Sequence, residues 1–336
     1  MSYLIMLNMS FDLIRYLFVL EVNSTLVWLP KWPAMELSLL LGEVIADALP
    51  IVDARAWKKS LSAWHSYCSD VARKKASVKF VNRNPWPIDA VIFWYPAKRS
   101  YGKGERILFE LKLLGRSADH ELFVEVILPA MEQIAMNPYI GTKYKNSLWG
   151  HFDISSVYSA RGSSWKPILK NGKLDLRRKI ISSQWSNGLK FGPDSFNSLD
   201  RIRWLSPFLV APASNKAGRT GNRKSMPVPP LSSILEAIAE RVCYVTLGKY
   251  STAMDFLNSI EKDELASWRE AMKYADSNSI CRHNIKKSSQ LFSGLRMGSQ
   301  TFKTPVHETL IPFLSLGSIL HIGEYTHFGC GTYTMV

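Results

Sequence analysis

Apolar and polar positions along the first part of the chain change period several times, which predicts a succession of strands and helices. Residues 11–24 form a nearly unbroken apolar run that is typical of a buried strand. Residues 34–49 and roughly 53–75 place apolar side chains at helical spacing. Residues 88–95 predict a second strand, and a glycine-containing turn at Tyr101 leads to a third, ILFELKLLG.

One more helix and one more strand complete this first half. Residues 119–135 have the pattern of an amphipathic helix, and Asp119 stands where an N-cap is favoured. A strand is expected at 150–158. The order strand, helix, strand, strand, helix, strand is that of the ferredoxin-like or RNA-recognition unit.

A second unit of the same kind is expected further along the chain. Residues 161–198 are rich in Ser, Gly, Lys and Arg and predict a basic connector with a short hairpin. After it we expect strands at 201–211, 280–288 and 317–323, helices at 231–250 and 261–275, and a last strand at the end. The predicted fold is α+β, with tandem ferredoxin-like domains at 1–160 and 199–336 and a C-terminal glycine-rich loop.

Composition agrees with a packed two-domain protein. The chain has 336 residues, 46% of them hydrophobic, and its many aromatic residues exclude a disordered chain. Four widely separated cysteines without a CxxC pair favour neither a zinc site nor a disulfide framework. The apolar start is interrupted by Asn8, Asp12, Arg15 and Glu21, so we expect a soluble, cytoplasmic protein without a membrane span.

The charge points to an anionic partner. Lys and Arg number 42 against 28 Asp and Glu, for a net charge of +14. The excess is concentrated in blocks, such as 281–306 with five cations and no acid. A solvated excess of surface lysine is the alternative, but this clustering favours nucleic acid over a membrane surface or an evenly basic exterior.

The C-terminal segment HIGEYTHFGCGTYTMV contains Gly323, Gly329 and Gly331 between two strand-like stretches. Glycines there allow positive φ and leave backbone N–H groups accessible, so that a phosphate chain can lie against them. A bulged hairpin that needs glycine for geometry alone is the alternative. No helical pattern follows the glycines, which sets aside Rossmann and P-loop motifs.

This segment resembles the C-terminal glycine loop of the RAMP superfamily, and in particular of the CRISPR-associated endoribonucleases that cut precursor CRISPR RNA within its repeats. The resemblance extends to LPKWPAMELSLLLGEVIADAL, to ILFELKLLGRSADHELFVEVILPAMEQIA with YIGTKYKNSLWGHFDI, and to RIRWLSPFLVAPAS. Cys330 departs from the family, in which a bulky residue is common at this position. A buried cysteine can substitute as a small hydrophobic residue.

The resemblance implies a metal-independent endoribonuclease without a cofactor, in which a ribose 2′-OH attacks the adjacent phosphate once per repeat. It also implies the repeat hairpin of CRISPR RNA as ligand, and an effector complex whose other CRISPR subunits are partners. A non-catalytic RAMP subunit that holds CRISPR RNA is the alternative, and a basic RNA-binding protein outside CRISPR is a third. Family members carry the key histidine on or near the first helix, whereas residues 34–49 contain none.

Histidine suits the base and acid of such a reaction because its pKa lies near neutrality, and Lys or Arg suits the phosphorane charge. His65 is the nearest candidate, with Lys58 seven residues away on nearly the same helical face. A surface position beside a buried Trp64 is the alternative for His65. His283, between Arg282 and Lys286, is a substitute catalytic group or an RNA contact.

Further residues are expected to bind RNA rather than to cut it. Lys143 and Lys145 share one strand face, and the other candidates are Lys216, Arg219, Arg223, Arg282, Lys286, Lys287, Gly323, His327, Gly329 and Gly331. Within a strand at 280–288, Arg282 and Lys286 would share a face and Lys287 would lie on the other. Trp149, Tyr144 and Tyr333 are candidate base-stacking residues, with core packing as their alternative.

Overall fold

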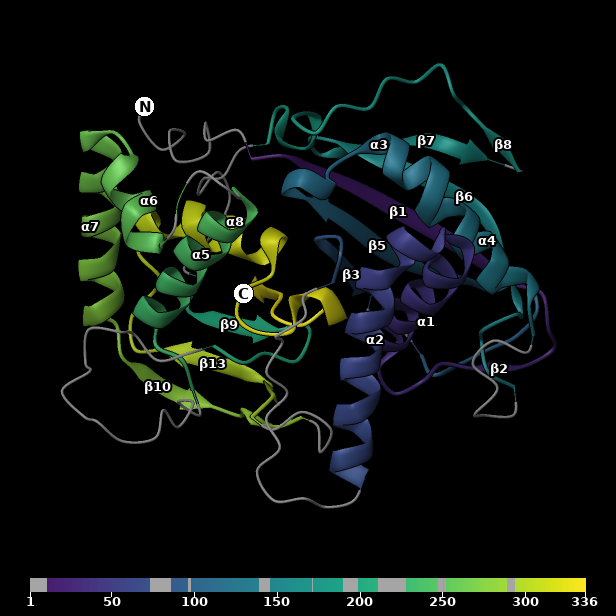
Figure 1. Ribbon diagram of the computed structural model, residues 1–336. Helices are drawn as coiled ribbons and strands as arrows, with labels where there is room; N and C mark the ends of the chain where they lie inside the picture. Colours follow the sequence, from purple (N-terminus) through teal and green to yellow (C-terminus); the bar gives the residue numbers. More distant parts are fainter. Residues whose placement is uncertain are drawn as a thin grey trace. The chain divides into compact units, whose positions relative to one another are not determined.

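The computed structural model describes residues 11–72, 86–95, 98–138, 146–170, 172–189, 199–210, 228–246, 250, 252–288 and 294–336. The chain divides into two compact units, one formed by Asp12–Leu189 and the other containing Lys190–Val336. In each unit, helices pack on an antiparallel sheet (Figure 1). Every helix in the described ranges is too short or too polar to span a bilayer.

The first unit is built on a six-stranded sheet with the order β3-β5-β1-β6-β7-β8. Its strands are β1 (Leu13–Val22), β3 (Ala90–Trp94), β5 (Arg106–Leu114), β6 (Phe152–Arg161), β7 (Ser164–Lys170) and β8 (Lys173–Leu174). All neighbouring pairs are antiparallel. A separate two-stranded sheet joins β2 (Val27–Trp28) to β4 (Ser100–Tyr101).

Helices cover one face of this sheet. They are α1 (Pro33–Ala48), α2 (Ile51–Ala72), η1 (Gly115–Ser117), α3 (His120–Leu122), the π-helical η2 (Phe123–Ile127) and α4 (Leu128–Met136), and η3 (Gln184–Ser186) follows β8. Asp119 accepts a hydrogen bond from the backbone N–H of Glu121 at 2.9 Å, which confirms the predicted N-cap.

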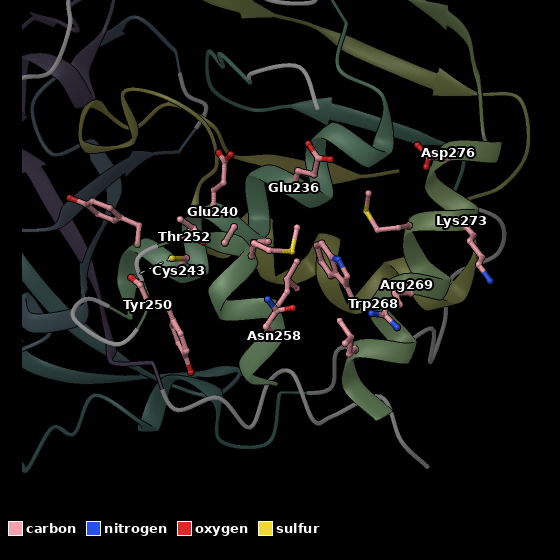
Figure 2. A pocket seen from close by; sticks show the side chains of 17 residues that line it. Glu236, Glu240, Cys243, Tyr250, Thr252, Asn258, Trp268, Arg269, Lys273 and Asp276 are labelled. Carbon is pink, nitrogen blue, oxygen red and sulfur yellow. Dashed lines mark hydrogen bonds between the residues drawn. The ribbon is translucent and has the colours of Figure 1, made fainter. Parts of the chain in front are cut away.

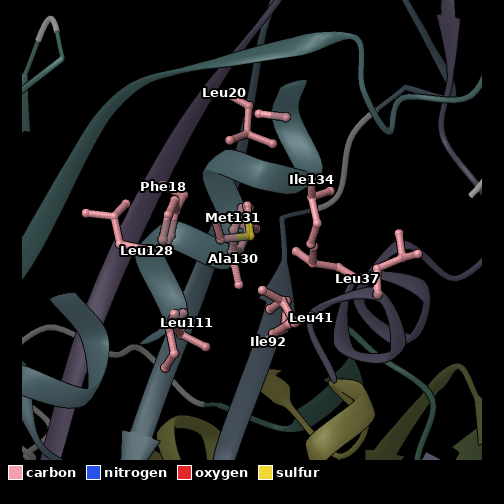
Figure 3. Close-up of a cluster of buried hydrophobic side chains, with 14 of the residues drawn as sticks. Phe18, Leu20, Leu37, Leu41, Ile92, Leu111, Leu128, Ala130, Met131 and Ile134 are labelled. Atoms are coloured by element: carbon pink, nitrogen blue, oxygen red, sulfur yellow. The ribbon is translucent and has the colours of Figure 1, made fainter. Parts of the chain in front are cut away.

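The core of this unit lies between the sheet and the helices (Figure 3). Phe18 of β1 and Leu111 of β5 point toward Leu41 of α1 and Met131 of α4, and all four are buried. Alternation along β1 and β5 therefore directs one set of side chains into the core. Full burial of each such side chain stabilises the unit by roughly 1.5–3 kcal/mol.

The second unit has a four-stranded antiparallel sheet with the order β10-β13-β9-β14. Its strands are β9 (Arg201–Trp204), β10 (Ile280–His283), β13 (Ser299–Phe302) and β14 (Tyr333–Met335), and a separate hairpin pairs β11 (Lys286–Lys287) with β12 (Arg296–Met297). The helices are α5 (Leu231–Val245), α6 (Ala253–Ser259), α7 (Lys262–Ser277), η5 (Glu308–Leu310), α8 (Ile311–Leu320) and η6 (Thr326–Phe328). An α+β fold with antiparallel sheets is thus confirmed.

Among the predicted elements of the second unit, the strand at 317–323 is wrong and the strand at 280–288 is in fact two strands. The strand predicted at 201–211 and the helix predicted at 231–250 are present but shorter, the strand as β9 (Arg201–Trp204). Residues 317–323 were predicted as a strand, but Ile311–Leu320 form the buried helix α8. A short apolar run suits a buried helix as well as a buried strand, and Pro312 in its first turn favours the helix. The helix predicted at 231–250 ends at Val245.

The strand predicted at 280–288 is in fact two strands. β10 pairs with β13 through His283, whereas Lys286 and Lys287 pair with β12 in a different sheet. The side chain of Asn284 accepts a hydrogen bond from the backbone N–H of Ser299 at 2.6 Å, at the point where the strand breaks. The predicted alternation of Arg282, Lys286 and Lys287 within one strand therefore does not hold.

The basic segment 161–198 contains the hairpin β7–β8. β7 pairs with β6 from Ser164 to Lys170, so this hairpin extends the sheet of the first unit. The boundary between the two compact units falls after Leu189. The short hairpin predicted within this segment is therefore present.

Candidate nucleic-acid interface

Two arginines of β9 lie on the sheet face opposite the helices of the second unit. Ile202 and Trp204 are buried, whereas Arg201 and Arg203 are exposed. Successive side chains of a strand point to opposite faces, so the two arginines share one face.

Strand register brings a third arginine into the same row. Thr301 of β13 pairs with Arg201 of β9 on one side and with Arg282 of β10 on the other. Arg201 Nε donates a hydrogen bond to Thr301 Oγ1 at 3.2 Å. Arg201, Arg203 and Arg282 together are called the arginine face below.

The charge of this surface is one-sided. None of the strands β9 to β14 contains an Asp or Glu. Ser299 and Thr334 flank Arg203 in register and add hydroxyl groups. Guanidinium groups and hydroxyls on an acid-free sheet are suited to the phosphates and sugars of a nucleic acid strand.

The other predicted basic residues of β10 and β11 follow Arg282 of the arginine face along the chain. Arg282, His283, Lys286 and Lys287 are all exposed. His283 is paired in register with the buried Gln300 of β13, at the edge of the sheet. All four groups are therefore accessible to a ligand, and their role in binding RNA stays a prediction.

His65 and Lys58 lie on α2 of the first unit, and both are exposed. His65 Nε2 is 3.5 Å from Glu43 Oε1 of α1, with side-chain exposures of 62% and 45%. Trp64 is buried next to it, as the surface-residue alternative expects. Glu43 lies close enough to orient the imidazole, but a catalytic role for His65 stays a prediction.

The glycine-rich loop connects helix α8 to strand β14, rather than two strands. Gly323 and Gly331 have φ of 84° and 88°. A Cβ at Gly323 would lie 2.3 Å from the carbonyl oxygen of Leu209, and one at Gly331 would lie 1.9 Å from that of Ile322. Positive φ and these close approaches require glycine at both positions.

The predicted accessibility of the loop N–H groups is wrong for two of the three glycines. Gly329 donates its backbone N–H to Thr326 O at 2.8 Å, and Gly331 donates to Pro207 O at 2.8 Å. Both glycines are also buried. The geometric alternative therefore accounts for these two residues, and a direct contact with RNA stays a prediction for Gly323, Gly329 and Gly331.

His327 lies in η6 of this loop, with its ring centroid 4.0 Å from that of Phe328. Burial, and then the positive charge of Arg241, lower the pKa of His327 to about 3. Arg241 is itself buried and donates Nε to Leu320 O at 3.2 Å. At neutral pH the imidazole is therefore uncharged and offers a phosphate at most a neutral hydrogen bond.

Several predicted RNA-binding residues lie outside the described residues, and two predicted base-stacking residues are corrected. Lys143, Lys145, Lys216, Arg219 and Arg223 lie outside the described residues, as does Tyr144. Trp149 and Tyr333 are buried, so their prediction as base-stacking residues is wrong. Tyr333 Oη donates to Leu314 O at 2.8 Å, and Trp149 Nε1 donates to Glu36 Oε2 at 3.1 Å, which fixes both rings in the core.

The first sheet carries charge on the face opposite its helices as well, but there Glu110 and Lys112 are buried, and the exposed Arg106 is paired with Glu21. Glu110 is hydrogen-bonded to Arg15 Nε and to Tyr95 Oη, the latter at 3.4 Å. Burial alone raises the pKa of Glu110, but Lys112 and Arg15 outweigh it and hold that pKa below its ordinary value. The guanidinium of Arg15 also lies over the ring of Trp165 at 5.3 Å.

A groove of about 1080 Å³ runs between α5, α6 and α7 of the second unit (Figure 2). Glu236 and Glu240 line it from α5, and Arg269 and Lys273 line it from α7, with the buried Trp268 between. Its charges are mixed and its lining is mainly apolar. This groove therefore lacks the single-signed field of the arginine face and is the poorer candidate for a polyanion.

Sequence reasoning named Arg282 but missed Arg201 and Arg203. Their signal was present in RIRW, where cationic and large apolar residues alternate within a predicted strand. Strand alternation alone would have placed both arginines on the exposed face. The pairing of β9 with β13, which adds Arg282 to that face, required the structure.

No protein-family model and no curated protein matches this chain. Among solved structures, a partial Cas6-RT-Cas1–Cas2 complex is similar over 97% of this chain and 46% of its own, with 14% identity and a TM-score of 0.52. A Cas6-RT-Cas1–Cas2 complex has the same identity, TM-score and coverage of this chain, but the similarity covers 29% of its own chain. A Cas6 product complex is 14% identical, with a TM-score of 0.46, and the similarity covers 97% of this chain and 99% of its own. The chain thus spans less than half the length of the first two. Its fold is similar to the fold of these Cas6-containing structures.

Proposed function

We propose that this protein binds the repeat hairpin of CRISPR RNA and cuts precursor CRISPR RNA once per repeat. The observation that carries the proposal is the acid-free arginine face on a Cas6-like fold. Solved structures of Cas6 proteins include a substrate mimic complex and product complexes. A net charge of +14 supports a polyanionic ligand.

The proposed architecture is a tandem of ferredoxin-like domains. In both units the second, third, first and fourth principal strands are neighbours in that order, as β3-β5-β1-β6 and as β10-β13-β9-β14. This order supports two units of one kind. We keep residues 1–160 and 199–336 as the two domains, with 161–198 as the basic connector that contributes β7 and β8.

The proposed reaction needs no metal ion. A base removes the proton of a ribose 2′-OH, the 2′-oxygen attacks the adjacent phosphorus, and the bond from phosphorus to the 5′-oxygen breaks. An acid returns a proton to the departing 5′-oxygen, so the products end in a 2′,3′-cyclic phosphate and a 5′-hydroxyl. His65 is proposed as the acid–base group, with Lys58 facing the developing phosphorane charge, and His283 is the substitute.

A cleavage assay in EDTA tests the chemistry. Wild-type protein should convert repeat RNA to a 2′,3′-cyclic phosphate product, and a 2′-deoxy nucleotide at the cut site should block conversion. His65→Ala should lose about 10²–10⁴-fold in cleavage rate and keep its affinity for the hairpin. Unaltered cleavage would remove His65 from the mechanism, and His283→Ala would then be measured.

Binding measurements test the interface separately from the chemistry. Arg201→Ala/Arg203→Ala/Arg282→Ala should weaken hairpin binding strongly, whereas Lys262→Ala/Arg269→Ala/Lys273→Ala removes three exposed cations of α7 and serves as the matched control. Equal losses in the two triple variants would overturn the proposed interface. Equal affinity of wild-type protein for unrelated RNA would favour a basic RNA-binding protein outside CRISPR.

A non-catalytic RAMP subunit is the second candidate function, and one observation favours it. Helix α1 contains no histidine, although the family resemblance places the key histidine on or near this helix. Tight binding of the hairpin without any cleavage would establish this alternative. In either case, we propose that the protein stays on the CRISPR RNA 3′ hairpin as part of an effector complex with other CRISPR subunits.

A further inference from the structure

Trp28 is an exposed tryptophan on a rigidly held strand. All eleven tryptophans lie in the described residues, and Trp28, with 49% of its surface accessible, is the only one in an exposed position. Strand β2, which carries it, pairs with β4 through Ser100. A large aromatic ring that is left in solvent on a fixed backbone is a preformed surface for a flat ligand.

The backbone around Trp28 is held on both sides. Its N–H donates to Asn146 O at 2.8 Å, and it forms a parallel bridge with Ser147. On the other edge, the N–H of Leu29 donates to Arg99 O at 2.8 Å. Because the strand is bonded to two neighbours, little conformational entropy is lost when a ligand stacks on the ring.

The segments that flank Trp28 are cationic. Residues 26–32 and 98–104 contain Lys31, Lys98, Arg99 and Lys103 and no Asp or Glu. All four cations are exposed, although Lys98 also pairs with Glu105. A second aromatic residue, Trp32, lies four residues on, with Lys31 Nζ 5.7 Å from its ring centroid.

We propose that Trp28 is a nucleobase-stacking site for single-stranded RNA, with the surrounding cations holding the phosphates on either side of the stacked base. The combination of an exposed aromatic ring and a cationic groove is how proteins bind single strands without reading their sequence. The proposal rests on the proposed RNA-binding function and adds a contact outside the arginine face. Contact with a partner protein is the competing use of Trp28, because the neighbouring Leu26 is also exposed. The four neighbouring cations favour RNA.

Binding of a short oligoadenylate tests the stacking directly. Trp28→Ala should bind it about tenfold more weakly than wild-type protein, whereas Trp28→Phe should keep most of the affinity. Trp28→Leu keeps an apolar side chain without an aromatic face and should behave like Trp28→Ala. Unfolding by urea should be little changed in all three, because about half of the surface of Trp28 is in solvent.

An abasic strand of the same length isolates the base from the phosphates. Wild-type protein should bind this strand about tenfold more weakly than the oligoadenylate, and Trp28→Ala should bind both strands alike. Unchanged affinity of Trp28→Ala for the base-bearing strand would overturn the proposal and would leave protein contact as the use of Trp28. That result would not touch the proposed function, which is tested separately by hairpin binding of the arginine-face variant and by cleavage of repeat RNA.

Discussion

Four neighbouring strands of the first sheet have the same order as the four strands of the second sheet. The two sheets differ in the side chains on the face opposite their helices. In the first unit that face holds Arg15, Glu110 and Lys112, of which Glu110 and Lys112 are buried. In the second unit the same kind of face exposes Arg201 and Arg203. The face opposite the helices thus carries cations that are paired with a carboxylate in the first unit and cations that are available to a ligand in the second unit.

The difference lies in the partner that each cation has. Arg15 shares the charge of Glu110 and stacks against Trp165 at 5.3 Å. Arg201 instead donates to the neutral hydroxyl of Thr301, and no carboxylate within the described part of the chain forms an ion pair with it. A cation beside a carboxylate stabilises the fold, whereas a cation beside a hydroxyl is free to neutralise a phosphate.

Removal of Glu110 should have the largest effect on stability. Glu110→Ala leaves the buried Lys112 and the partly buried Arg15 without their carboxylate, which should lower the free energy of unfolding by roughly 3–5 kcal/mol. Urea unfolding measures this loss. Arg203→Ala is the matched control and should stay within about 0.5 kcal/mol of wild type. Equal losses in the two variants would mean that the two faces do not differ in the way described.

Removal of the arginine face should have the largest effect on RNA affinity. The triple variant Arg201→Ala/Arg203→Ala/Arg282→Ala should bind the repeat hairpin on the order of 100-fold more weakly, from about 1 kcal/mol for each lost contact. The slope of log K against log salt should also fall, by roughly 0.7 for each lost phosphate contact on a single strand. An unchanged slope would show that these arginines do not meet phosphates.

Acid should weaken the first unit through Glu110. Its folded-state pKa lies below the ordinary value, so the ionised carboxylate stabilises the fold above that ordinary value and the contribution is lost as the pH falls through the folded pKa. Wild-type protein should therefore lose its stability advantage over Glu110→Gln as the pH is lowered below about 4.5. Urea unfolding of both proteins across this range checks the sign. A constant difference at all pH values would exclude the linkage.

The smallest expected effect separates charge from geometry on the arginine face. Arg201→Lys keeps the positive charge but loses the planar fork that binds a phosphate through two hydrogen bonds. Hairpin affinity should fall about threefold, or roughly 0.6 kcal/mol, with the salt slope unchanged. A loss as large as that of Arg201→Ala would mean that geometry rather than charge dominates at this position.

The amphipathic elements of the first unit were predictable because its helices and strands each bury one face of regular period. The buried strand β1 and the cap at Asp119 followed directly from that pattern. In the second unit, α8 is apolar on all sides, so period could not separate helix from strand. The strand β13 has the short polar sequence SQTF, which no hydrophobic pattern identifies.

The candidate site was harder to predict than the fold because register assembles it. Arg282 meets Arg201 only through Thr301, a residue 100 positions from Arg201 along the chain. Trp28 carried no signal at all, since exposure of a tryptophan cannot be read from a strand-like sequence. Trp149 and Tyr333 are the converse, because the chemistry of their rings suits RNA but their positions place them in the core.

Gly331 changes what a shared motif can tell us. No other residue fits there, because any side chain would collide with the carbonyl oxygen of Ile322 and φ is 88°. Selection for folding alone would preserve this glycine in a protein that cuts RNA, in one that only holds RNA, and in one that has lost both activities. A search for relatives that uses this loop would therefore find proteins with the same backbone conformation. Other residues would have to distinguish the active nucleases among them from the inactive proteins.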